Sequence, residues 1–301
     1  MMTALIGGVP LSFAYAQTAP TSSDAVAAPA TASEGLTATA WVQSSTEAKI
    51  AAHQAYRVAM RQLDAALRDK TWSAALEQGE AFKKLPPAII VDLDETVLDN
   101  SAYFARLVRD NGIYTDEGWN SWTAQADAPA LEGAVQFLRY ADSKGVQIFY
   151  VSNRTAPEEA ATRANLRRLG CPLQGPSDHV LLAREQTDWT SDKSSRRRYV
   201  AQKYRVLLLV GDDLNDFVSA RSLTLAQRAD LGTKYSNNWG ERWILLPNPL
   251  YGSWEDAIYG FNSDASHQDM LRLKTGVLQY REPASSSAAT GNSVSANATS
   301  P

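Results

Sequence analysis

The stretch that most constrains this chain is an apolar run that ends in closely spaced acidic residues. Residues 88–91, Ala-Ile-Ile-Val, are typical of a strand buried on both faces of a parallel sheet. Asp92 and Asp94 follow at once, with Thr96 two positions further on. In open α/β sheets, ligands bind at the carboxyl ends of the strands. Because neighbouring carboxylates repel each other, the pattern predicts a nearby cation or a shared proton, and hence a metal-assisted active site.

Two other interpretations of this stretch are weaker. A calcium-binding loop starting at Asp92 would need glycine at its sixth position and glutamate at its twelfth, where the chain has Val97 and Tyr103. A helix start capped by Asp or Thr is left open by the local pattern alone. Features further along the chain favour the catalytic interpretation.

Composition excludes several other chemistries. The 301 residues are long enough to bury a sizeable core, and the single cysteine, Cys171, excludes an internal disulfide and a cysteine metal cluster. The three histidines lack metal-ligand spacing. A net charge of -4 gives no reason to expect a nucleic acid polymer as partner, and we interpret the basic triplet at 196–198 as a solvated helix face. Aspartate and glutamate are therefore expected to carry the chemistry.

Both ends of the chain differ in composition from the rest. Residues 1–16 end in Ala-Tyr-Ala, a pattern typical of a secretory cleavage site, so we expect a signal peptide that is cleaved before Gln17. That segment is too short and too broken by glycine and proline to span a membrane. Small and polar residues dominate 17–40 and 282–301, which predicts a disordered linker and a disordered tail. Residues 41–281 remain as the folded domain.

Strand and helix patterns alternate along that domain, as in an α/β fold with a Rossmann-like parallel sheet flanked by helices. After the first strand, apolar runs predict four more, at residues 146–151, 179–183, 205–210 and 243–246. Capping and periodicity predict helices at about 44–72, then a helical piece to 84, and helices at 131–144, 155–169 and 266–280. We place the core at 86–101 and 131–262, the N-terminal helices at 44–84 and the C-terminal helix at 266–280.

The first helix shows a capping box and an apolar stripe. Ser44 and Glu47 form the box, and the stripe, which we interpret as core packing, follows at four-three-four spacing. Its members are Tyr56, Met60, Leu63 and Leu67.

Residues 102–130 are expected to form a small helical cap over the end of the first strand. They are unusually rich in aromatic residues, namely Tyr103, Phe104, Tyr114, Trp119 and Trp122. We expect most of these rings to form a small hydrophobic subcore and one or two of them to stack on a ligand.

Polar residues follow two other predicted strands. Ser152 and Asn153 come between a strand and a helix whose capping box is Thr155 and Glu158, a place where anions bind. The strand at 205–210 is followed by a glycine and three aspartates that again need a counter-charge. These residues are Gly211, Asp212, Asp213 and Asp216.

Together with Lys193 between them, these motifs resemble the haloacid-dehalogenase-like phosphatase superfamily. The closer resemblance is to the class C acid phosphatase, or lipoprotein e(P4) 5′-nucleotidase, family. It rests on residues 92–101, 150–154, 192–194, 211–217 and 246–248, and it covers about 41–280.

The resemblance implies a role for each motif residue. Asp92 would be the nucleophile that forms an aspartyl-phosphate, and Asp94 the general acid and base. Mg²⁺ would be held by the Asp92 side chain, the Asp94 backbone carbonyl and Asp212. Phosphate would be bound by Ser152, Asn153 and Lys193. Supporting roles would fall to Thr96, Asp213 and Asp216, the last either as a ligand through water or as a partner of Lys193.

The chain departs from the family pattern twice. Asp213 stands where the family usually has asparagine, which adds a negative charge beside the expected metal. The lipid-acceptor cysteine is absent, because Cys171 is the first cysteine. We therefore expect a soluble periplasmic or secreted protein without a lipid or transmembrane anchor, and the sequence leaves a homodimer open.

The expected substrate is a small phosphomonoester. By resemblance, Tyr114 and Tyr251 would sandwich the base of a nucleoside 5′-monophosphate. Two alternatives remain: a phosphotransferase or mutase that uses the same intermediate, and a non-catalytic surface protein that binds a ligand on the same fold.

Overall fold

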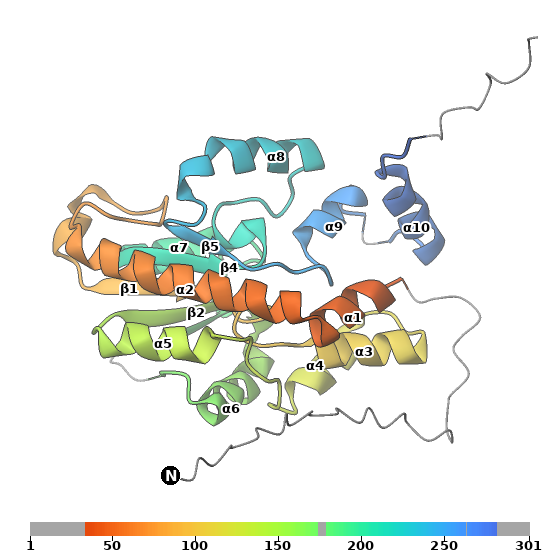
Figure 1. Ribbon diagram of the computed structural model, residues 1–301, viewed down its shortest axis with the longest axis horizontal. Coiled ribbons are helices and arrows are strands. Elements are labelled where there is room, and N and C mark those ends of the chain that lie inside the picture. The colour runs from red at the N-terminus through yellow and green to blue at the C-terminus, as the bar shows by residue number, and fades with distance from the viewer. Residues whose placement is uncertain (1–33, 174–178, 263, 282–301) are drawn as a thin grey trace, which may run out of the picture.

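The computed structural model describes residues 34–173, 179–262 and 264–281. The expected signal peptide, most of the expected linker and the tail lie outside this range. At the centre is a five-stranded parallel sheet with strand order β3-β2-β1-β4-β5 (Figure 1). The strands are β1 (Pro87–Val91), β2 (Gln147–Thr155), β3 (Val180–Ala183), β4 (Arg205–Gly211) and β5 (Trp243–Leu245). The predicted parallel α/β sheet is confirmed.

The central strands β1 and β4 are buried on both faces, as their apolar sequences indicated. Alternate residues of β1 contribute to different core clusters, Ile89 and Val91 to one and Ala88 and Ile90 to the other. The register between β1 and β4 shifts between Ala88 and Ile89. Such a bulge turns two successive residues of one strand toward the same face.

Helices cover both faces of the sheet (Figure 1). One face packs against α2, α5 and α6, and the other against α7 and the segments around Phe217 and Trp243. The bounds of the α-helices are α1 (Leu36–Ser44), α2 (Thr46–Arg68), α3 (Ser101–Asp110), α4 (Asp116–Thr123), α5 (Ala134–Ser143), α6 (Glu159–Leu169), α7 (Ser194–Ala201), α8 (Leu225–Lys234), α9 (Ser253–Ile258) and α10 (His267–Gly276). Short 3₁₀ turns are η1 (Glu80–Lys84), η2 (Ala156–Glu158), η3 (Leu214–Asp216) and η4 (Ser236–Asn238).

The long helix α2 differs from its prediction at both ends and in its buried stripe. Ser45, not Ser44, caps it by accepting a hydrogen bond from the Ala48 N–H at 3.0 Å. The helix ends at Arg68, four residues before the predicted end. Its fully buried side chains are mostly alanines, which let α2 approach the sheet closely, whereas the predicted Met60 and Leu67 lie only partly buried at the margin. The buried set is Ala52, Tyr56, Ala59, Leu63 and Ala66.

Several other boundaries were wrong. Helix α1 begins at Leu36, inside the predicted linker, because it packs against α2 and α3, contacts that composition does not reveal (Figure 1). The helical piece before β1 is only the 3₁₀ turn η1. Strand β2 continues through Ser152 and Asn153 to Thr155, since Thr155 still pairs with Ala183 of β3. The short helices α8 and α9 were not predicted.

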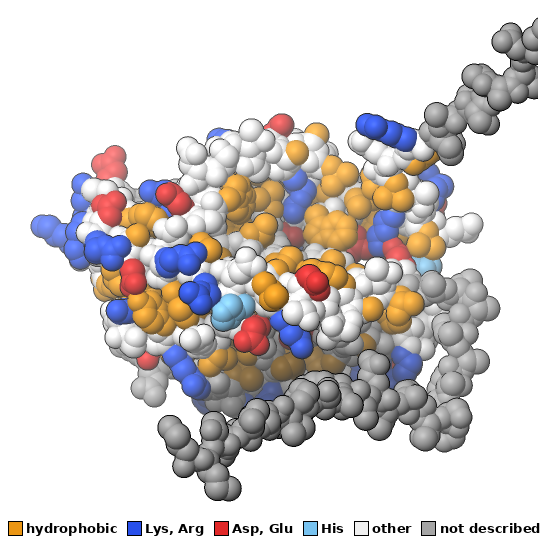
Figure 2. Space-filling view, viewed as in Figure 1, with side chains coloured by type: hydrophobic (Ala, Val, Ile, Leu, Met, Phe, Trp, Pro, Cys, Tyr) orange, Lys and Arg blue, Asp and Glu red, His pale blue; other side chains and the backbone are white. Residues whose placement is uncertain are grey.

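The predicted insertion after β1 is helical. It consists of α3 and α4, which lie together at one end of the molecule beside α1 (Figure 1). On the face drawn in Figure 2, acidic and basic side chains are interspersed among hydrophobic ones. Within the described ranges, no helix has both the length and the apolar character needed to cross a membrane.

Replacement of Leu63 by alanine tests the packing of α2 on the sheet. Leu63 is fully buried, so Leu63→Ala should lower the free energy of unfolding by about 2–5 kcal/mol through lost burial and the cavity left behind. Ile50→Ala is the matched control, because Ile50 lies on the same helix and is 50% exposed. Denaturant unfolding measures both variants. Equal losses for the two would contradict this arrangement of α2.

Candidate active site

The carboxyl ends of three adjacent strands meet at one edge of the sheet. Asp92 follows β1, Ser152 lies near the end of β2, and Asp212 follows β4. Lys193 immediately precedes α7 and reaches the same edge. Parallel strands place their carboxyl ends together, so residues up to 120 positions apart converge here.

Three carboxylates crowd together at this edge. Asp92, Asp212 and Asp216 each offer an oxygen, and these oxygens all lie within 4.8 Å of one another. The Lys193 ammonium donates to Asp92 and, at 2.6 Å, to Asp216. The side chains of Lys193, Asp92 and Asp216 are no more than 7% exposed. One buried ammonium therefore faces three acidic groups.

The electrostatics of this cluster favour a further cation. Burial raises the pKa of Asp212 well above its ordinary value, and the neighbouring Asp92 and Asp216 charges raise it further. Burial also raises the pKa of Asp216 to about 7, although Lys193 opposes the rise. Ionised carboxylates held this close need a compensating charge. Oxygen donors alone make up the cluster, and a hard cation such as Mg²⁺ prefers such ligands, so the residues fit a divalent metal.

Neighbouring residues hold Asp212 in position. The Thr96 hydroxyl donates to one carboxylate oxygen at 3.2 Å, and the Asn248 amide donates to the other at 2.8 Å. A Cβ atom at Gly211 would clash with the Asp216 side chain, so this position needs glycine. Asn248 belongs to the 246–248 motif, but the sequence alone indicated no role for it.

Asp94 lies outside the carboxylate cluster and is paired with Arg154. The Arg154 guanidinium donates to Asp94 at 2.7 Å through Nη2 and at 3.1 and 3.2 Å through Nε. Burial lowers the pKa of Arg154, but the Asp94 charge, the hydrogen bonds to Asp94 and the nearby Glu158 and Tyr251 together outweigh it, so the pKa is raised overall. Asn100 and Ser152 also donate to Asp94, at 3.0 and 3.3 Å. Arg154 belongs to the 150–154 motif, but its pairing with Asp94 was not predicted.

Asn153 does not share the contacts of Ser152. Its amide donates to the Ser191 carbonyl at 3.1 Å, and its oxygen accepts from Arg196 at 2.7 Å. Arg196 also donates to the Ser152 carbonyl and to the Thr190 carbonyl. Asn153 thus links β2 to the segment before α7.

The interpretation of the basic triplet as a solvated helix face was wrong for two of its three members. Arg196 and Arg197 are 0% and 1% exposed, and only Arg198 faces solvent. Arg197 pairs with Glu77 at 2.9 Å and donates to the Asn215 carbonyl at 2.8 Å. Both buried guanidiniums satisfy backbone carbonyls of the loops that carry site residues, and this explains why arginine is tolerated there.

Asp213 faces away from the carboxylate cluster. Its carboxylate accepts from the Ser253 N–H at 2.7 Å and from the Ser253 hydroxyl at 2.5 Å. Arg228 lies 3.8 Å from it. The extra negative charge of Asp213, which we expected beside a metal, is therefore balanced at the start of α9. It still raises the pKa of Asp216.

Comparison with known proteins identifies the family. A profile described as "HAD superfamily, subfamily IIIB (Acid phosphatase)" matches residues 12–254. The chain belongs to this acid phosphatase family. Its fold is similar to that of the class C acid phosphatase from Bacillus anthracis, with a TM-score of 0.74 and 35% identity over 83% of this chain and 99% of that one. A second structure of that protein, with tungstate bound, matches equally well.

Curated relatives are more distant. Acid phosphatase 1 from Solanum lycopersicum is 26% identical over 169 residues, and the stem 28 kDa glycoprotein from Glycine max is 25% identical over 168. Each match covers 54% of this chain, which spans just over half the length of these relatives, 57% and 58%.

Most of the aromatic residues of the insertion pack together in the expected hydrophobic subcore. Tyr103 is buried and contacts the other four rings, with the nearest centroids at 5.3 Å. The subcore also supports Asp94: Trp122 donates to Asn100 at 2.8 Å, and Trp119 lies 5.9 Å from the Arg154 guanidinium.

The two tyrosines expected to sandwich a base lie in different surroundings. Tyr251 stacks on Phe104 with centroids 5.0 Å apart and donates to Glu95. Tyr114 is 53% exposed and contacts Tyr103 at 6.4 Å. Phe104 is the ring that faces Tyr251, and sequence reasoning did not single it out for stacking. Burial and the Asp94 charge raise the pKa of Glu95 to about 8.

Replacement of Arg154 by lysine tests whether Arg154 positions Asp94. Lysine cannot form the bidentate contact that orients Asp94, so we expect kcat for p-nitrophenyl phosphate to fall about 10- to 100-fold. Arg163→Lys is the control, because Arg163 pairs with Glu159 on the surface of α6 at 2.7 Å. Steady-state kinetics measure both. A kcat for Arg154→Lys equal to that of the control would show that Arg154 does not position Asp94.

Proposed function

We propose that this acid phosphatase hydrolyses small phosphate monoesters through an aspartyl-phosphate on Asp92, with Mg²⁺ as cofactor. The observation that carries the proposal is the position of Asp92. It is a buried carboxylate at the end of β1, bonded to Lys193 and within 4.8 Å of two further carboxylates.

In the first step, a carboxylate oxygen of Asp92 attacks phosphorus. The bond between phosphorus and the leaving oxygen breaks, and the alcohol takes a proton from Asp94. In the second step, water attacks phosphorus, Asp94 accepts the water proton, and the Asp92–phosphorus bond breaks. Lys193 and Ser152 are the groups we assign to the phosphoryl oxygens, with Asn153 supporting the same segment.

The different surroundings of the two aspartates support these roles. Asp92 sits against Lys193 in the carboxylate cluster, whereas Asp94 is held by Arg154 and Asn100. An acid that donates and then recovers a proton must stay in one orientation through both steps.

Asp92, Asp212 and Asp216 are the side chains we expect to hold Mg²⁺, and the Asp94 carbonyl remains an expected ligand. When bound, the metal would neutralise the carboxylates and polarise the phosphoryl group. Tungstate is an oxyanion of phosphate-like charge, and its presence in the Bacillus anthracis relative supports an oxyanion site in this family.

Nucleoside 5′-monophosphates are the substrates we propose. The Tyr251–Phe104 stack offers an aromatic surface near the first loop of the site. Tyr251 is held to that loop because its hydroxyl donates to Glu95. Base–aromatic stacking contributes about 1–3 kcal/mol and tolerates many rings. Tyr114 remains a candidate for the second ring contact.

We also propose that the protein is exported to the periplasm or secreted. The cleavage-site pattern before Gln17 supports this, and so do the Glycine max relatives, which are named as stem glycoproteins.

Asp92→Asn tests the covalent step. The variant keeps the shape of the side chain but removes the nucleophile, so turnover of p-nitrophenyl phosphate and of nucleotides should fall at least about 10³-fold. Acid quenching with a ³²P-labelled substrate should trap label on the wild-type chain and none on the variant. Asp230→Asn, at an exposed position of α8, is the control. Full activity of Asp92→Asn would rule out Asp92 as the nucleophile.

Thermal unfolding with and without metal tests the carboxylate cluster. Ligands that bind only the folded state stabilise it, so Mg²⁺ should raise the unfolding temperature of the EDTA-treated wild type by several degrees. The pKa of Asp212 is raised in the folded state. The metal-free fold therefore loses stability as the pH rises above the ordinary pKa of this group. Metal-free Asp212→Asn should therefore unfold at a higher temperature than metal-free wild type at pH 7, with no further rise on adding Mg²⁺. A Mg²⁺ response equal to that of the wild type would exclude Asp212 as a ligand.

A further inference from the structure

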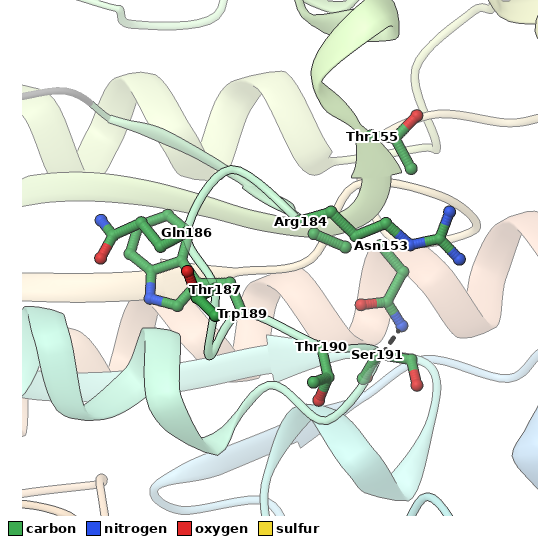
Figure 3. A pocket seen from close by; sticks show the side chains of 9 residues that line it. Asn153, Thr155, Arg184, Gln186, Thr187, Trp189, Thr190 and Ser191 are labelled. Atoms are coloured by element: carbon green, nitrogen blue, oxygen red, sulfur yellow. Dashed lines mark hydrogen bonds between the residues drawn. The ribbon is translucent and has the colours of Figure 1, made fainter.

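A polar cavity of about 390 Å³ lies beside the proposed phosphate-binding segment. One wall is the end of β2, at Asn153 and Thr155, and the other is the segment that runs from the end of β3 toward α7 (Figure 3). From that segment, Arg184, Thr187 and Thr190 line the space.

The lining is suited to an anion. It offers hydroxyl and amide groups and the guanidinium of Arg184, and no residue of the described lining is acidic, although the Thr155 hydroxyl donates outward to Glu158 at 3.0 Å. Glu185, in the same segment, turns back to accept a hydrogen bond from the Leu182 N–H at 2.9 Å. The lining therefore favours an anion, although the chain as a whole has a net charge of -4.

The backbone at Arg184 has an unusual conformation, and the side chain is exposed and lines the cavity. Its φ is 66°, in the left-handed region that non-glycine residues rarely adopt, and its N–H donates to the Trp189 carbonyl at 2.6 Å. The side chain extends past Asn153 toward the side where Thr155 lies (Figure 3). Within the part of the chain that the structure describes, the guanidinium forms no ion pair or hydrogen bond, so its donors are available to a ligand.

A second positive charge lies behind the cavity wall. Arg196 is fully buried and donates to two lining residues, Asn153 and Thr190, at 2.7 Å each. Burial lowers the pKa of Arg196 to about 10, so it stays protonated at neutral pH. Among the described residues, no carboxylate is in direct contact with it, although the charges of Asp92, Asp216 and Asp192 act on it, and its Nε has no hydrogen-bond partner.

The cavity shares a wall with the catalytic centre. Asn153 follows Ser152, whose hydroxyl donates to Asp94 at 3.3 Å. The Ser191 carbonyl accepts hydrogen bonds from both Asn153 and Asn215, which joins the cavity to the loop that carries Asp216.

We propose that this cavity is a second anion subsite that binds a phosphate group, with Arg184 as its recognition residue. The phosphate could belong to a substrate with two phosphate groups, such as a nucleoside bisphosphate, or it could be free inorganic phosphate. The substrate case rests on the proposed function, whereas the inorganic phosphate case does not.

Arg184→Met tests the substrate case. The ratio of kcat/KM for adenosine 3′,5′-bisphosphate to kcat/KM for adenosine 5′-monophosphate should fall about tenfold or more, because one charge-assisted contact to phosphate is lost. Arg184→Lys should recover part of the ratio, and Arg198→Met, an exposed arginine of α7, should leave it as in the wild type. An unchanged ratio in Arg184→Met, or an equal loss on both substrates, counts against recognition of a substrate phosphate in the cavity.

Equilibrium dialysis with radiolabelled inorganic phosphate tests the other case. Wild type should bind two phosphates per chain and Arg184→Met one, at low ionic strength where exposed charges are least screened. One phosphate per chain in both proteins, together with an unchanged substrate ratio, would overturn the subsite. A wild type that hydrolyses no phosphomonoester would refute the proposed function instead, and the dialysis would still report on the cavity.

Discussion

The repulsion among Asp92, Asp212 and Asp216 is the constraint on which the rest of the site depends. Their oxygens lie within 4.8 Å of one another in buried surroundings, and Lys193 supplies one positive charge against three acidic groups. Such crowding persists only where the backbone imposes it, and here the carboxyl ends of two central strands do so. Asn248 then orients Asp212. The raised pKa values of Asp212 and Asp216 express the same demand for a cation.

Two aspartates only two residues apart are given different surroundings by different parts of the fold. Asp92 faces Lys193, from the start of α7, while Asp94 faces Arg154, from the end of β2. Environments that differ in this way are how proteins assign distinct roles to neighbouring carboxylates. The insertion after β1 contributes to the second environment, because Trp122 fixes Asn100, which in turn donates to Asp94. The aromatic subcore therefore helps to position Asp94.

The errors of sequence reasoning share one physical cause. Consecutive arginines at 196–198 resemble a solvated face, yet Arg196 and Arg197 are buried because loops from distant parts of the chain present carbonyl oxygens to them. Helix α1 lies in a segment of linker-like composition and is held by packing on its neighbours. The contacts of Asp213 were not predicted either, because Ser253, 40 residues away, donates to its carboxylate. Each outcome depends on a partner that is remote in sequence.

What the sequence by itself determined is the sheet and the order of its acidic motifs. Unbroken apolar runs such as 88–91 can only be satisfied by burial on both faces, and a carboxylate directly after such a run has to stand at the edge of a parallel sheet. The tertiary structure decided which of these side chains touch. It separated Asp94 from the cluster, brought Asp216 into it, and turned Asn153 toward Arg196 and a neighbouring polar cavity. Local patterns specify the strand on which a residue lies, whereas contacts across the sheet edge depend on how all the strands and loops pack together.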